Sequence, residues 1–114
     1  VFAVPGVHVL RLWRLDDGKA LARVPELERL RVLRVIGGAS AAQLNALFDS
    51  PHLSALTALH LDNNRANDST AVLLADGRFP RLAELRLRLN AIGNSGAFAL
   101  ARSPHLESLA LLDV

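Results

Sequence analysis

The chain has 114 residues, of which 51% are hydrophobic and only 4% aromatic, so leucine must fill most of any core. The formal net charge is only +2, although the pI is about 10.4 because nearly every basic residue is arginine; this charge alone does not indicate a polyanion-binding protein. Cysteine is absent, which excludes a disulfide framework and thiolate chemistry, and no apolar run approaches the roughly 18 residues of a membrane span.

One short pattern recurs along the chain and predicts its elements. Each copy has an apolar, a variable and a second apolar residue, with another apolar residue three positions upstream. The five copies are Leu10-Arg11-Leu12, Leu33-Arg34-Val35, Leu59-His60-Leu61, Leu85-Arg86-Leu87 and Leu109-Ala110-Leu111. They follow one another at 23, 26, 26 and 24 residues, a period that predicts a tandem repeat array. We expect one domain with repeats at about 5–24, 25–50, 51–79, 80–103 and 104–114, the last one partial, excerpted from a longer array.

Each copy predicts a short strand with one buried face, and all but the last are followed by a segment that favours a helix. In chain order, the expected helices cover 18–23, 40–48, 68–75 and 94–102, and each precedes a proline, which cannot continue a helix. We expect Ser40, Asp68 and Asn94 to be the N-caps of the last three helices. The acidic pair before residue 18 favours a helix start there as well.

The pattern Leu-x-x-Leu-x-Leu-x-x-Asn-x-Ile/Ala, then a helix and Ser-Pro-His-Leu, is similar to the ribonuclease-inhibitor-like class of leucine-rich repeat, especially its bacterial tandem-repeat members. Units 56–75 and 82–101 match it at nearly every position. The resemblance implies an α/β leucine-rich-repeat solenoid, a horseshoe arc with a parallel sheet on its concave side and helices on its convex side. It also implies that Asn64 and Asn90 are structural ladder residues, whose amides satisfy turn backbone groups between neighbouring repeats.

Catalytic and metal chemistry find little support. His52 and His105 occupy the same slot two repeats apart, and a strand spacing of ~4.8 Å would separate them by ~10 Å, too far to share a zinc ion. The chain has no Gly-x-Ser-x-Gly elbow, no phosphate loop and no dinucleotide-binding glycine pattern. We therefore predict that the chain is not an enzyme, and we assign it no catalytic residue, metal or cofactor.

The outward side chains of the strands are the candidate site, because the variable residue of each copy points away from the core. Stacked arginines repel one another, so these side chains do not stabilise the sheet. The predicted partner-binding residues are Arg11, Trp13, Arg34, Ile36, His60, Asp62, Arg86 and Arg88. Two plainer interpretations remain: arginines that solvate an exposed face, offset in part by Asp62 and Glu84, and a Trp13 that packs against a further N-terminal repeat.

These residues favour a protein–protein interaction module whose unidentified partner has an acidic or mixed-charge surface and contacts the concave sheet. The first alternative is binding of nucleic acid or another polyanion by the column of outward arginines, Arg11, Arg34 and Arg86. The second is a purely structural spacer in a larger multidomain protein. We expect no membrane partner. The arginine-rich, alanine-rich composition suggests a bacterial source, and the lack of a visible signal peptide favours the cytoplasm.

Overall fold

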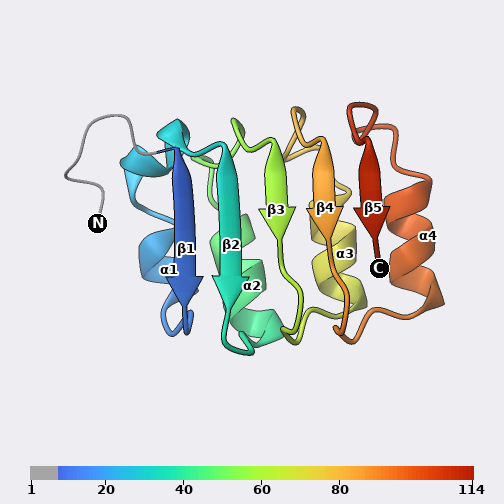
Figure 1. Cartoon of the computed structure of the whole chain (residues 1–114), viewed down its shortest axis with the longest axis horizontal. Coiled ribbons are helices and arrows are strands. Elements are labelled where there is room, and N and C mark those ends of the chain that lie inside the picture. The colour runs from blue at the N-terminus through green and yellow to red at the C-terminus, as the bar shows by residue number, and fades with distance from the viewer. Residues whose placement is uncertain (1–7) are drawn as a thin grey trace.

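The computed structural model describes residues 8–114, which form a five-stranded parallel sheet (Figure 1). The strands are β1 (Val9–Trp13), β2 (Val32–Ile36), β3 (Ala58–His60), β4 (Glu84–Arg86) and β5 (Leu111–Asp113). Their order in the sheet is their order in the chain, so each strand pairs only with its sequence neighbours. Parallel neighbours need a crossover connection, and the segments between the strands provide it.

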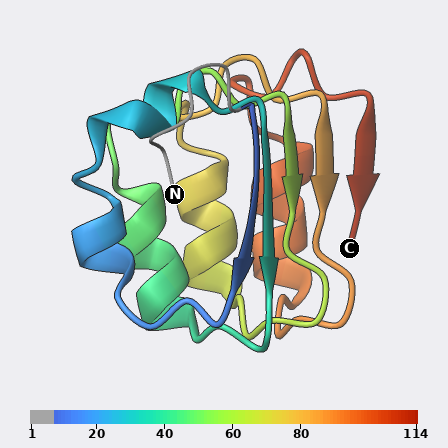
Figure 2. The ribbon, with the colours of Figure 1, turned by 60° about the vertical axis from the view of Figure 1, so that its left-hand side comes forward.

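The crossovers contain four α-helices and one 3-10 turn. The helices are α1 (Gly18–Leu21), α2 (Ala41–Phe48), α3 (Asp68–Leu74) and α4 (Asn94–Ala101), and the turn is η1 (Pro25–Arg29). Figures 1 and 2 show all four helices on the same side of the sheet, where consecutive helices pack against each other. The predicted mixed α/β architecture with a parallel sheet is confirmed, and no other element of residues 8–114 covers the opposite face of the sheet.

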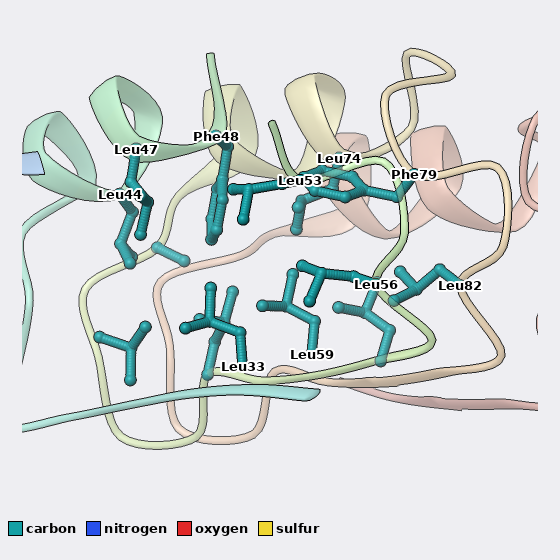
Figure 3. Close-up of a cluster of buried hydrophobic side chains, with 14 of the residues drawn as sticks. Leu33, Leu44, Leu47, Phe48, Leu53, Leu56, Leu59, Leu74, Phe79 and Leu82 are labelled. Carbon is teal, nitrogen blue, oxygen red and sulfur yellow. The ribbon is translucent and has the colours of Figure 1, made fainter. Parts of the chain in front are cut away.

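Leucine fills the space between the sheet and the helices, as the composition predicts. The inward strand residues Leu33, Leu59 and Leu85 are fully buried. Figure 3 shows Leu33 and Leu59 with their neighbours from the helices and turns, and Leu85 belongs to the same cluster of buried side chains. The rings of Phe48 and Phe79 meet edge to face with centroids 5.8 Å apart. Full burial of each such side chain stabilises the fold by about 1.5–3 kcal/mol, so the array is held together chiefly by this shared core.

The helix starts depart from the sequence expectation in two of three cases. Ser40 caps α2 as predicted, accepting a hydrogen bond from the Gln43 amide. The predictions for Asp68 and Asn94 are each wrong by one residue, because Asn67 and Gly93 are the N-caps of α3 and α4. Asn67 is in extended backbone conformation and forms a capping box with Thr70, which leaves Asp68 inside the first turn.

Asp68 instead connects two units. Its Oδ1 atom accepts hydrogen bonds from the backbone amides of Gly93, at 2.7 Å, and Gly96, at 3.2 Å. The carboxylate therefore lies at the start of α4, where the free amides and the helix dipole favour a negative charge. A residue expected to cap its own helix stabilises the next one.

The expected fifth strand is also misplaced by three residues. The structure pairs Leu85 with Leu112 and Arg86 with Asp113, so Leu112 takes the place expected for Leu109 and the strand begins at Leu111. The reason is a tight turn that precedes each of the last two strands: the Leu82 amide donates to the Phe79 carbonyl, and the Leu109 amide donates to the Leu106 carbonyl. The step Leu106-x-x-Leu109-x-x-Leu112 thus repeats Phe79-x-x-Leu82-x-x-Leu85.

Within residues 8–114, no helix combines the length and the hydropathy that crossing a bilayer would require.

Candidate functional site

The uncovered face of the sheet carries the predicted site residues in rows that cross the strands. The central row follows the register of the paired strands and reads Arg11, Arg34, His60, Arg86 and Asp113. On one side of it lie Val9, Val32, Ala58, Glu84 and Leu111. On the other side Trp13 pairs with Ile36, and Asp62 and Arg88 occupy the equivalent places just beyond β3 and β4. Because β5 is shifted, the row ends on the acidic Asp113 and not on Ala110.

Backbone geometry fixes where the outer row turns back toward the helices. Residues 14, 37, 63 and 89 stand one position beyond that row in their units, and all have positive φ, between 57° and 106°. Across these turns the Arg14 amide donates to the Ile36 carbonyl at 2.9 Å, and the Asn63 amide donates to the Arg88 carbonyl at 2.9 Å. The outer row is therefore held at a defined place on the face and is not part of a loose loop.

In the half of the face formed by β3 to β5, the positive charges are already paired. The Arg86 guanidinium contacts Oε1 of Glu84 through Nε at 2.8 Å and Nη2 at 2.7 Å. Asp62 accepts a hydrogen bond from the Arg88 amide at 2.8 Å, and the Arg88 Nε lies 4.0 Å from Oδ1 of Asp113. This half of the face is therefore close to neutral.

Glu84 is the centre of that paired group. Its Oε2 lies 3.4 Å from His60 Nε2, a long contact, and the imidazole nitrogen has no well-aligned hydrogen-bond partner. The interaction with His60 and the neighbouring Arg86 guanidinium lower the pKa of Glu84 below its ordinary value, although partial burial acts in the opposite direction. Glu84 is thus kept ionised, and its carboxylate neutralises the neighbouring Arg86 guanidinium.

The half formed by β1 and β2 is different. Arg11 and Arg34 are direct partners in the register of the two strands. Within residues 8–114, no carboxylate lies within 4.0 Å of either guanidinium. The Nε atom of Arg34 is moreover buried and has no hydrogen-bond partner in that part of the chain. Two like charges side by side without a counterion are a cost to the isolated fold, and an unpaired buried donor adds to it.

Exposed apolar side chains surround this unpaired charge. Trp13 is 70% exposed and Val9 57% exposed, and both are on the same strand as Arg11. Ile36, half-buried, lies beside Trp13 in the next strand. In residues 8–114, Trp13 lies in solvent on the face of the sheet. Large exposed apolar side chains next to arginine are typical of protein-binding surfaces.

Asn64 and Asn90 lie away from this face, between neighbouring units. Asn64 is buried; its Oδ1 accepts from the Ala39 amide at 2.8 Å and its Nδ2 donates to the Val35 carbonyl at 2.9 Å. Asn90 makes the equivalent bonds one unit later, to the Ala66 amide and the Leu61 carbonyl. Both amides therefore link the turn of one repeat to that of the preceding one.

Nothing resembling a catalytic or metal centre is gathered in residues 8–114, where no group of three metal-ligating side chains comes together. His52 is engaged with Glu28 at 3.1 Å. Two hollows of about 270 and 200 Å³ lie beside α1 and share Lys19 and Arg23. The smaller one also borders Asp49 and Ser50, and the Ser50 hydroxyl donates to the Ala22 carbonyl at 2.6 Å.

Sequence reasoning missed two residues that shape the site. Asp113 became visible only with the corrected register of β5. The sequence indicates Glu84 only as an acid near the arginines, whereas the contact of its Oε1 with Nε and Nη2 of Arg86 divides the arginines into a paired and an unpaired group. The signal in the sequence was the Glu-x-Arg spacing, which places both side chains on the same face of one strand.

No protein-family model and no curated protein matches the chain. Among solved structures, an internalin from Listeria monocytogenes is similar at 16% sequence identity and a TM-score of 0.44. The match covers 82% of this chain and 37% of the internalin chain, so the chain spans well under half the length of that protein. At this level the likeness assigns the chain to no family.

Proposed function

We propose that the chain is a leucine-rich-repeat module of the ribonuclease-inhibitor-like class that binds another protein on the uncovered face of its sheet. The class is supported by the sequential parallel strands, by the helices on one side, and by the asparagine bonds between units. A rigid sheet face of this kind offers broad contact area without reorganisation on binding.

The observation that carries the proposal is the unpaired pair Arg11 and Arg34 next to the exposed Trp13. Tryptophan and arginine are the residue types most enriched among those that dominate binding energy at interfaces. An acidic partner would supply the missing counter-charge at Arg11 and Arg34, whose guanidinium groups are not paired with a carboxylate of residues 8–114.

Polyanion binding is the competing explanation for the same arginines. A nucleic acid needs several cationic contacts along its backbone, and single strands also need a series of stacking aromatics. Here Glu84, Asp62 and Asp113 are on the same face as the arginines, and Trp13 is the only tryptophan of the chain. These features favour a protein partner of mixed chemistry over a phosphate backbone.

Affinity capture with the chain as bait, with and without nuclease, tests the proposal. Wild type is compared with a Trp13→Ala/Arg34→Glu variant and with Arg102→Glu, which changes a charge at the end of α4 on the helix side. We expect capture that survives nuclease, is lost in the double variant and persists in Arg102→Glu. Capture that is abolished by nuclease, or that is lost only in the helix-side variant, would contradict it.

A further inference from the structure

We infer that the ligand of this face is a short extended peptide segment with alternating apolar, acidic and apolar side chains, and that it binds the β1–β2 half alone. We call this half the β1–β2 patch and define it by Val9, Arg11, Trp13, Val32, Arg34 and Ile36. The inference rests on the proposed function for the choice of face, and it adds the place on that face and the chemistry of the partner.

Charge complementarity restricts binding to this half. Between β3 and β5, Glu84 neutralises Arg86 and contacts His60, while Asp113 and Asp62 lie close to Arg88. In the β1–β2 patch, Arg11 and Arg34 have no carboxylate within 4.0 Å anywhere in residues 8–114. An acidic side chain therefore gains most over the patch and is repelled by the carboxylates elsewhere on the face.

The guanidinium of Arg34 contains a buried donor, Nε, without a hydrogen-bond acceptor in the described chain. Groups of this kind normally have one. Because Nε itself is closed off from the surface, a ligand carboxylate would accept from the outer nitrogens of the same guanidinium, which supplies the missing counter-charge. Two strands away, the Arg86 guanidinium already has a counter-charge, because Oε1 of Glu84 lies 2.8 Å from its Nε and 2.7 Å from its Nη2. The ligand's acid would give Arg34 the partner that Arg86 already has.

The apolar side chains fix the spacing of the ligand. Along β1 the outward order is Val9, Arg11 and Trp13, and along β2 it is Val32, Arg34 and Ile36, each at alternate positions. An extended peptide lying along the strands has the same two-residue side-chain period, about 6.6 Å per repeat. Its best match is therefore an apolar residue, any residue, Asp or Glu, any residue, and a second apolar residue. Trp13, at one end of the patch, would receive one of the two apolar side chains.

The test selects ligands from a displayed library of random 12-residue peptides, with the 114-residue chain as target. Wild type should enrich acidic residues two positions from an aliphatic or aromatic residue. An Arg11→Glu/Arg34→Glu variant should reject those peptides and enrich basic ones in their place. Recovery of no peptide, or of peptides without an acidic residue at this spacing, would overturn the inference.

The selected peptides are then synthesised and their affinities measured by fluorescence anisotropy. We expect at least about a tenfold weaker affinity for Arg11→Gln/Arg34→Gln and less than about a twofold change for the matched pair Arg86→Gln/Arg88→Gln. Circular dichroism checks that all variants fold. Equal losses in the two pairs would overturn the restriction to the β1–β2 patch.

Two further outcomes separate this inference from the proposed function. If peptide binding is unchanged by every substitution on the sheet face, Trp13→Ala included, but is lost in Arg102→Glu, the inference and the proposed function are both overturned. A captured protein that needs Trp13 and Arg34, with no peptide ligand recovered, would leave the proposed function standing and overturn the peptide inference. A 20-residue oligothymidylate that binds through Arg11 and Arg34, with affinity falling steeply in salt, would overturn it in favour of a polyanion.

Discussion

Replacement of Asn64 by alanine should destabilise the fold more than the same replacement at Asn90, although both residues make equivalent bonds. Asn64 is 6% exposed, and its amide is the partner of the Ala39 N–H and of the Val35 carbonyl. Loss of a buried partner costs the desolvation of the group left behind, about 1–3 kcal/mol for each, so we expect a loss of about 3 kcal/mol. Asn90 is only half-buried, so water replaces part of its bonds and the expected loss is about 1–2 kcal/mol.

Urea unfolding followed by circular dichroism measures the two losses, and an unchanged slope of free energy against urea would show that both variants keep the same unfolding transition. Asn64→Asp is the control, because it retains the oxygen that accepts from Ala39 and removes the Nδ2 donor to Val35. The reasoning would be refuted if Asn64→Ala cost less than Asn90→Ala, or if both changes were below about 0.5 kcal/mol, the usual size of a neutral surface substitution.

Three smaller predictions concern single positions. Gly18→Ala should lower the free energy of unfolding by about 1–3 kcal/mol, since a Cβ at this position would overlap the Gln43 carbonyl oxygen of α2. An unchanged urea midpoint would be inconsistent with that packing. Leu89→Asn should stabilise the chain by about 0.5–1 kcal/mol, because Leu89 is 73% exposed and has φ at 57°, a left-handed conformation that asparagine adopts more easily. Asn63 has this conformation in the preceding unit. A lower temperature of thermal unfolding would count against this explanation. The pKa of Glu84 is lowered in the folded chain, so its contribution to stability is present above the ordinary glutamate range and is lost as pH falls through the lower folded value. The acid unfolding curve of Glu84→Gln should therefore lack that part of the wild-type loss of stability. Identical curves for the two proteins would contradict this prediction.

Much of the architecture was accessible from the sequence because each repeat solves the same packing problem with the same residues. The first four strands lie where the apolar-x-apolar copies predicted them, and the four helices agree within three residues at either end. The fifth strand was misplaced because Leu109-Ala110-Leu111 has the same local pattern as a true strand. Only the longer step through Leu106 and Leu112 distinguishes the two registers.

Local signals also failed where two side chains compete for one role. Asn67 and Asp68 are both good N-cap residues, and the capping box with Thr70 decides in favour of Asn67. At the candidate site, the sequence predicts a column of three arginines and a histidine whose charge nearby acids offset in part. Which arginine is already paired depends on the side-chain geometry of Glu84, and no periodicity reports that.

The fluorescence of Trp13 on binding tests the central claim most directly, since Trp13 is the only tryptophan of the chain and lies exposed at one end of the β1–β2 patch. The partner or peptide must itself lack tryptophan. As the indole leaves water, we predict that the emission maximum shifts to shorter wavelength and that the shift reaches its limit when all of the chain is bound. The Arg11→Glu/Arg34→Glu variant should show no such shift. Saturated binding, measured independently, with an unchanged emission spectrum would show that the partner binds elsewhere on the molecule.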